Sequence, residues 1–183
     1  EYVDISGVKD NLTGVTDISI EMLFRTNYSG GGIYNNILIS GHTTSGGNLF
    51  RIGIADDGGV YISPDGGSGN NVSFGSGYND NNWHSLTVNL NSDNSRQAFV
   101  DGIEIPVSNT GNFDWNTVEF VSIGKEYDGG STGDFYEGSV YNVKIYSNTN
   151  LISHYKGNEL DTWTDLEGNS DGVVYGSPIL VDF

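Results

Sequence analysis

Hydrophobic residues alternate with polar ones along several short stretches of the chain. In residues 17–24 they occupy every second position, so an extended strand places them all on one face. They are Ile18, Ile20, Met22 and Phe24. The same two-residue period recurs in residues 83–90, 96–100, 118–123 and 140–146. It is typical of β-strands that are buried on one face and solvated on the other.

Turn-forming residues separate these stretches. Asp57-Gly58 and Asp101-Gly102 each stand between two of them and predict tight hairpins, because these residues tolerate positive φ angles. Residues 151–156 predict a short helical turn, and residues 173–175 and 179–181 predict closing strands. About a dozen short strands joined by polar turns predict an all-β fold, an antiparallel two-sheet sandwich.

The length of 183 residues fits one domain of ordinary size, so we expect a single domain over residues 1–183. Residues 157–171 form the one shift in composition. They are polar and rich in turn residues, yet they contain Leu160, Trp163 and Leu166. We therefore expect residues 157–183 to be a C-terminal tail packed on the sandwich, with Trp163 holding the tail to the body.

The charge of the chain limits its partners. Seven Lys and Arg residues stand against 24 Asp and Glu residues, which gives a net charge of -17. Nucleic acid is excluded, because phosphate binding needs a cationic patch, and an anionic membrane surface is excluded for the same reason. A strongly acidic polysaccharide would need a bridging divalent cation. The chain has no cysteine, which removes disulfides, thiolate nucleophiles and zinc ribbons.

Four segments resemble one family. Trp83-His84-Ser85-Leu86, followed by Phe99-Val100-Asp101-Gly102, resembles the W-H-x-L and F-V-D-G signature of laminin-G-like, concanavalin A-like jelly-roll domains. Residues 1–5 with 18–24, residues 121–124 and residues 135–146 resemble further strands of that family in the same order. The resemblance implies a jelly-roll fold with Trp83 in its core. It leaves the function open, because this fold is found in lectins, adhesins, hydrolases and spacers.

A narrower resemblance concerns the pentraxins, which are calcium-dependent lectins of the same fold. Residues 124–128 resemble their G-x-E-x-D calcium loop, and Asn35-Asn36 resembles their Asp-Asn pair with its first acid replaced. The resemblance implies a Ca²⁺ site, because calcium prefers carboxylate, amide and carbonyl oxygens. The alternative is that these acidic loops are simply solvated. The implied ligands are Asn35, Asn36, Glu126, Tyr127 through its carbonyl, Asp128 and Asp134.

Several aromatic residues stand beside amides or carboxylates in predicted loops. Sugars are bound by rings that stack on their C–H faces and by planar polar groups that bond pairs of hydroxyls. We therefore expect loops at the rim of the sandwich to bind a neutral polysaccharide or a cell-surface glycan. The candidate ligand-binding residues are Tyr34, Asn36, Tyr78, Asp80, Trp115 and Tyr127.

Catalysis fits the sequence poorly. The nearest thing to a hydrolase carboxylate pair is Asp17 and Glu21, whose Cα atoms would lie about 13 Å apart in a strand. We expect a non-catalytic, lectin-like carbohydrate-binding module of a secreted, cell-surface or virion-surface protein, within a larger parent protein or an oligomer. The alternative is a structural or adhesive module of a phage tail or fibre, or of a bacterial surface adhesin, that makes protein–protein contacts.

Overall fold

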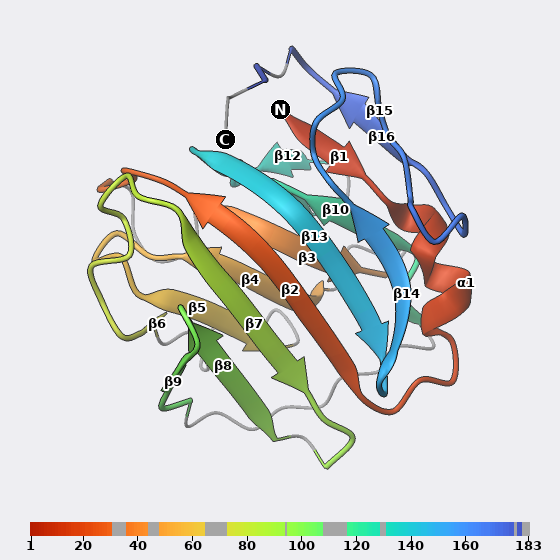
Figure 1. Ribbon diagram of the computed structural model, residues 1–183, viewed down its shortest axis with the longest axis horizontal. Coiled ribbons are helices and arrows are strands. Elements are labelled where there is room, and N and C mark those ends of the chain that lie inside the picture. Colours follow the sequence, from red (N-terminus) through yellow and green to blue (C-terminus); the bar gives the residue numbers. More distant parts are fainter. Residues whose placement is uncertain are drawn as a thin grey trace.

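The chain folds into two β-sheets packed face to face (Figure 1). The computed structural model describes residues 1–30, 36–43, 48–64, 73–93, 95–107, 117–128, 131–177 and 179–180. The predicted antiparallel sandwich is confirmed, because each sheet buries one face against the other. Within these ranges, no helix has the length and apolar character needed to cross a membrane.

The larger sheet has eight strands in the order β15-β16-β1-β10-β3-β4-β5-β6. Every neighbouring pair in it is antiparallel. Its strands are β1 (Tyr2–Asp4), β3 (Ile37–His42), β4 (Asn48–Ile54), β5 (Val60–Pro64), β6 (Ser73–Phe74), β10 (Phe120–Ile123), β15 (Thr162–Trp163) and β16 (Gly172–Tyr175).

The smaller sheet has six strands in the order β14-β13-β2-β7-β8-β9, again antiparallel throughout. It is the nearer layer in Figure 1, and no described element lies in front of β13, β2 and β7 in that view. Its strands are β2 (Ile18–Arg25), β7 (His84–Leu90), β8 (Arg96–Val100), β9 (Ile103–Ile105), β13 (Ser139–Ser147) and β14 (Asn150–Tyr155).

Three short elements complete the described fold. The strands β11 (Glu126–Asp128) and β12 (Ser131–Gly133) form a hairpin against β3 and β4. This hairpin covers the side of the eight-stranded sheet that faces away from the other sheet. The 3-10 helix η1 (Ser6–Val8) and the single-turn helix α1 (Lys9–Leu12) follow β1.

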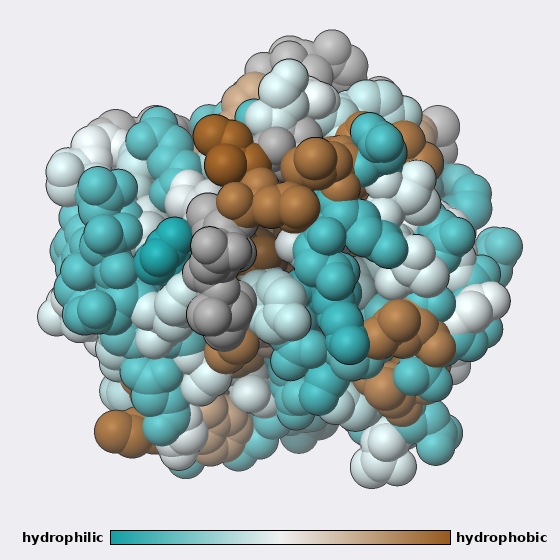
Figure 2. Space-filling model, turned by 45° about the horizontal axis from the view of Figure 1, so that its top comes forward, coloured by the Kyte–Doolittle hydropathy of each residue, from teal (hydrophilic) through white to brown (hydrophobic). Residues whose placement is uncertain are grey.

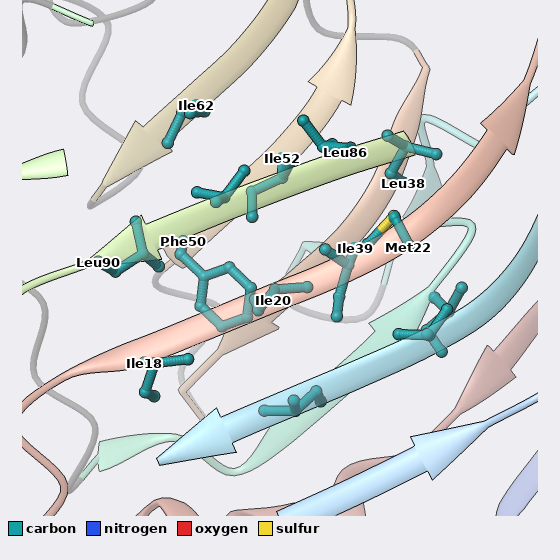
Figure 3. Close-up of a cluster of buried hydrophobic side chains, with 14 of the residues drawn as sticks. Ile18, Ile20, Met22, Leu38, Ile39, Phe50, Ile52, Ile62, Leu86 and Leu90 are labelled. Atoms are coloured by element: carbon teal, nitrogen blue, oxygen red, sulfur yellow. The ribbon is translucent and has the colours of Figure 1, made fainter. Parts of the chain in front are cut away.

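The core lies between the two sheets. The four alternating hydrophobic residues of β2 are each at most 3% exposed, as their spacing predicts. Figure 3 shows side chains of β2 and β7 meeting those of β3, β4 and β5 across the gap between the sheets. The labelled members of this cluster are Ile18, Ile20, Met22, Leu38, Ile39, Phe50, Ile52, Ile62, Leu86 and Leu90.

The predicted turns and the predicted helix fare differently. Asp57-Gly58 joins β4 to β5 and Asp101-Gly102 joins β8 to β9, with positive φ angles at three of these four residues, so both hairpin predictions are confirmed. The helical turn predicted for residues 151–156 is wrong, because residues 150–155 form β14 and pair with β13. The predicted strand at residues 173–175 lies within β16, whereas residues 179 and 180 form no strand.

The C-terminal segment joins the edge of the larger sheet. β16 pairs with β1 along three residues, and β15 pairs with β16. Trp163 is buried in the hydrophobic core, where its indole N–H donates to the carbonyl of Glu159 at 3.2 Å. The Asp165 carboxylate is buried and accepts backbone N–H groups from both β14 and its own loop, at 2.8 Å from His154 and 3.1 Å from Glu167.

Candidate functional site

The solvent side of the six-stranded sheet carries a group of side chains that we call the open face. Because directly paired residues on neighbouring strands point to the same side, the register assigns its members. Most of them are half-exposed. They are Ser19, Glu21, Leu23 and Arg25 of β2, Ser85, Thr87 and Asn89 of β7, Gln97 and Phe99 of β8, Glu104 of β9, Ser139, Tyr141, Lys144 and Tyr146 of β13, and Leu151 and His154 of β14.

Glu21 lies in the middle of the open face. The Tyr146 hydroxyl donates to its Oε2 at 3.1 Å, and the Lys144 Nζ atom lies 4.0 Å from the same oxygen. Burial and the neighbouring Glu21 carboxylate raise the pKa of Tyr146, so this hydroxyl stays a donor. A carboxylate offers about four acceptor positions, so Glu21 retains capacity for hydroxyl groups from solvent or from a ligand.

Arg25 and Trp83 form one end of the open face. The guanidinium carbon of Arg25 lies 5.0 Å from the centre of the Trp83 ring, a cation–π distance. Its Nη2 atom donates to the Ser139 hydroxyl at 3.5 Å. The family resemblance implied that Trp83 is a core residue, and this is wrong, because the side chain is half-exposed and lies outside the buried cluster.

A β-bulge in β13 shapes the other side of the face. The register shifts between Tyr141 and Lys144, so that two residues of β13 lie opposite one residue of β2. Asn142, at the bulge, has a φ angle of 55°, and its Oδ1 lies 2.7 Å from the His154 Nε2 atom. The extra residue directs both Tyr141 and Lys144 to solvent. Tyr141 and Tyr146 are then separated by about 13 Å along the sheet.

The predicted rim residues lie in several different environments. Tyr34, Asn35 and Trp115 are outside the described residues, and only the backbone of Tyr127 and Asp128 is described, in β11. Asn36 is buried, where its Oδ1 accepts from the Glu137 N–H at 2.6 Å and its Nδ2 donates to the Thr26 hydroxyl at 3.5 Å. Through these hydrogen bonds, Asn36 links the segments that contain Thr26 and Glu137.

Tyr78 and Asp80 lie together in a cluster around His84. The Tyr78 ring meets the His84 ring edge-on, at 5.6 Å between centres. His84 Nε2 lies 3.0 Å from Asp80 Oδ1, and its Nδ1 lies 2.8 Å from Asp101 Oδ2. The His84–Asp101 contact joins the two motifs that carry the family resemblance, since one contributes the histidine and the other the aspartate.

The carboxylates of Asp80 and Asp101 and the imidazole of His84 shift one another's pKa values. Burial lowers the pKa of His84, but the hydrogen bonds and charges of Asp101 and Asp80 outweigh burial and raise it overall. The hydrogen bonds from Asn82 and His84 lower the pKa of Asp80 to about 2. The cluster therefore favours a protonated imidazole between two carboxylates. That arrangement stabilises the loop before β7, and it commits Asp80 to internal contacts.

The residues implied as calcium ligands do not assemble in the described part of the chain. Both Glu126 carboxylate oxygens lie 2.9 Å from the Arg51 Nη1 atom in a buried ion pair. Asp134 is half-buried, with a φ angle of 57° in the loop after β12. Among the described residues, no group of three or more His, Asp or Glu side chains is arranged to hold a metal ion. Calcium therefore stays a prediction, with Glu126 engaged elsewhere.

A pocket of about 130 Å³ lies where β1, the start of β13 and the C-terminal segment meet. Tyr2, Tyr136, Trp163 and Leu180 are among the residues that line it. Hydrophobic residues also gather on the upper part of the view in Figure 2. The volume is well below the ~300–1,000 Å³ of typical small-molecule sites, so we regard the open face as the stronger candidate site.

Sequence reasoning missed the open face. Its aromatic residues, Phe99, Tyr141 and Tyr146, occupy solvent-side positions of strands whose alternation was recognised. That placement is the available signal, because large aromatic residues at positions expected to be polar need a reason. The bulge hid part of it, since Tyr141 and Lys144 do not share an even spacing along β13.

The family model of the concanavalin A-like lectin/glucanases superfamily matches residues 1–150. The chain belongs to this superfamily, which confirms the resemblance seen in its motifs. The search of curated protein sequences finds no match.

Solved structures with the same fold come from several bacteria. A Bacteroides ovatus protein to which carbohydrate binding has been ascribed is 16% identical, with a TM-score of 0.66 over 94% of this chain and 55% of that one. The CBM40 of Ruminococcus gnavus IT-sialidase is 18% identical, with a TM-score of 0.63 over 83% of this chain and 87% of that one.

The NanB sialidase of Streptococcus pneumoniae is 19% identical, with a TM-score of 0.61 over 84% of this chain and 25% of that one. At these identities the likeness shows the fold alone. The chain spans about half of the Bacteroides ovatus chain and a quarter of NanB.

Proposed function

We propose that this protein is a non-catalytic carbohydrate-binding module and that the open face is its binding surface. The observation that carries the proposal is the row of half-exposed aromatic rings beside hydrogen-bonding groups on a sheet face left uncovered by the described elements. Membership of a lectin-like superfamily supports it. So does the carbohydrate binding ascribed to the Bacteroides ovatus protein and seen in the Ruminococcus gnavus CBM40 bound to sialyllactose.

The geometry suits a short oligosaccharide. The backbone positions of Tyr141 and Tyr146 lie about 13 Å apart along the sheet, with Lys144 and Glu21 between them. Tyrosine rings stack on the C–H faces of sugars. Glu21 would accept sugar hydroxyls and Lys144 would donate to them. Hydrogen bonds exchanged with water each contribute about 0.5–1.5 kcal/mol net, so binding per site would be weak and would gain from several copies in a parent protein.

The separation of the two candidate carboxylates, Asp17 and Glu21, favours binding over turnover. On the open face, Glu21 is held by Tyr146 and Lys144, and Asp17 accepts the Ser92 N–H at 2.7 Å, so the two carboxylates serve separate contacts. The proposed setting is a secreted or surface-exposed protein. Melting the protein with and without calcium tests whether the module also binds that metal.

The test is glycan binding by two single variants and a matched control. Tyr141→Ala and Tyr146→Ala each remove one ring, and we expect a tenfold or greater loss of affinity, corresponding to about 1.4 kcal/mol. The melting temperature should fall by less than about 4 °C, because both rings are half-exposed.

Tyr175→Ala is the control for this experiment. Tyr175 is 45% exposed and lies on β16 of the other sheet, where it stacks on Tyr2. The Tyr175→Ala variant should bind glycans with the same affinity as the unchanged protein. If a glycan array identifies a ligand and its affinity is unaffected by both open-face variants, the binding surface lies elsewhere and the proposal for this face is refuted.

A further inference from the structure

The basic residues of this acidic chain are distributed unevenly. Three of its seven Lys and Arg residues are buried, at 3–8% exposure. They are Arg51, Arg96 and Lys125. A fourth, Lys9 on α1, is neutralised by Glu119 at 2.9 Å. The remaining three are Arg25, Lys144 and Lys156.

These three residues lie on or directly after adjacent strands of the six-stranded sheet. Arg25 ends β2, Lys144 lies on β13, and Lys156 directly follows β14. The alternation of β14 continues through His154, which faces solvent, and Tyr155, which is buried, so Lys156 points to the open-face side. Burial and then the positive charges of Lys144 and Lys156 lower the pKa of His154. This effect is consistent with both lysines lying close to His154.

Acidic residues are few on the same surface. Of the acids among the described residues, the register places two on the open face, Glu21 and Glu104, while Asp17, Asp101 and Glu137 flank its strands. Glu21 lies next to Lys144, whereas Glu104 lies on β9 at the far edge of the sheet. Asp165 and Glu167 also act on His154, from the loop beyond β14. On or directly after β2, β13 and β14, the basic residues Arg25, Lys144 and Lys156 therefore stand against Glu21 on the face and the flanking Asp17 and Glu137.

We infer that the ligand of the open face is an anionic saccharide, whose carboxylate or sulfate group is bound by Arg25, Lys144 and Lys156. This inference rests on the proposed function. A protein with a net charge of -17 repels anions over most of its surface, so a local group of cations is the part where such a ligand gains attraction. The planar guanidinium of Arg25 suits bidentate contact with a carboxylate or sulfate, and the two lysines add point charges.

The proposed anionic ligand differs from the neutral glycan expected from the net charge of the chain. Net charge describes the average field of the molecule, whereas a sugar contacts a few square nanometres of it. The charge of a ligand is therefore decided by the groups within about one Debye length, roughly 8 Å at physiological salt.

The first experiment compares three ligands that share one core: lactose, 3′-sialyllactose and 3′-sulfolactose, within a broader glycan array. We expect anionic glycans to be retained at least tenfold more strongly than their neutral counterparts, and we expect this preference to shrink as salt is raised from 0.05 to 0.5 M. Preference for carboxylated or for sulfated members identifies the anionic group, and either preference supports the inference.

The second experiment neutralises Glu21, and we expect opposite effects on the binding of anionic and neutral glycans. Glu21→Gln keeps the size and an acceptor for Tyr146 but removes the negative charge beside Lys144. For an anionic glycan we expect affinity to rise about threefold or more, because a repulsive charge is removed. For a neutral glycan the same change would lower affinity, because a carboxylate is the stronger acceptor of hydroxyl groups.

The cations are tested by Arg25→Gln, Lys144→Gln and Lys156→Gln, with Lys9→Gln as the matched control. Each of the first three should weaken binding of the anionic glycan about tenfold and reduce its salt dependence, and the control should do neither.

Two results separate this inference from the function that it extends. If neutral glycans bind as tightly as anionic ones and the Tyr141→Ala variant still loses them, carbohydrate binding stands and the anionic preference is overturned. If the array retains no glycan of either kind, the proposed function fails and this inference fails with it.

Discussion

The buried ion pair between Arg51 and Glu126 gives the sharpest prediction about stability. Arg51 on β4 is 8% exposed and Glu126 on β11 is 3% exposed, and both carboxylate oxygens lie 2.9 Å from one guanidinium nitrogen. The Glu126→Gln substitution keeps the shape of the side chain and removes its charge. Arg51 then stays buried next to the ring of Tyr61 at 5.8 Å and loses the charge of the Glu126 carboxylate.

The expected cost follows from that burial. Removing one partner of a buried ion pair destabilises a protein by about 3–5 kcal/mol, because the remaining charge is left uncompensated. In a chain of 183 residues each kcal/mol corresponds to a change in melting temperature of about 2–4 °C. We therefore expect Glu126→Gln to lower the Tm by about 6–20 °C.

The measurement is calorimetric melting of both proteins, in EDTA and in millimolar calcium. The matched control is the double variant Arg51→Met with Glu126→Leu, which replaces the pair by apolar side chains of similar volume. Such replacements are often neutral or stabilising, so most of the lost stability should return. Hydrogen bonding of the hairpin β11–β12 does not depend on either side chain.

The calcium hypothesis predicts a different result for the same variant. If Glu126 is a calcium ligand, Glu126→Gln should leave the Tm in EDTA unchanged and abolish a calcium-induced rise seen in the unchanged protein. That outcome would refute the assignment of Glu126 to a structural ion pair. A calcium-induced rise that survives in the variant would place the metal at other residues.

Two further predictions concern loops that the structure ties together. Because the pKa of His84 is raised in the folded state, its contacts with Asp80 and Asp101 stabilise the fold fully below pH 6.5 and lose this effect as pH rises through the folded pKa. The Tm difference between the unchanged protein and His84→Gln should therefore shrink between pH 6 and pH 8.5, and a difference that grows over this range would contradict the charge assignment. Asn36→Ala should lower the free energy of unfolding, measured by urea denaturation, by about 1–3 kcal/mol, because it leaves the Glu137 N–H without its acceptor. An unchanged free energy of unfolding would show that this hydrogen bond does not stabilise the fold.

The fold was predictable because its strands alternate so regularly. In β2 the inward face and the core residues both follow from one two-residue period. Residues 150–155 lacked that clear signal, and they form a strand because β13 offers them an edge with paired partners for Val143 and Lys144. Strand formation there depends on tertiary context, which a local pattern does not contain.

The proposed binding surface was harder to predict for a geometric reason. Its residues come from positions as distant as Glu21, Thr87, Phe99 and Lys144, and only the strand order makes them neighbours. Loop aromatics beside amides were visible in the sequence. Tyr78 is one of them, and the structure packs it partly buried against His84.

The pairing of β16 with β1 has a practical consequence for anyone who expresses this domain. The family match ends at residue 150, but the chain continues through β14, β15 and β16. A fragment cut at the end of the match would lose β14 with Lys156 behind it, and would leave the hydrogen-bonding edge of β1 bare. Bare strand edges pair with other chains, so such a fragment would be prone to aggregate and would be unsuitable for binding assays.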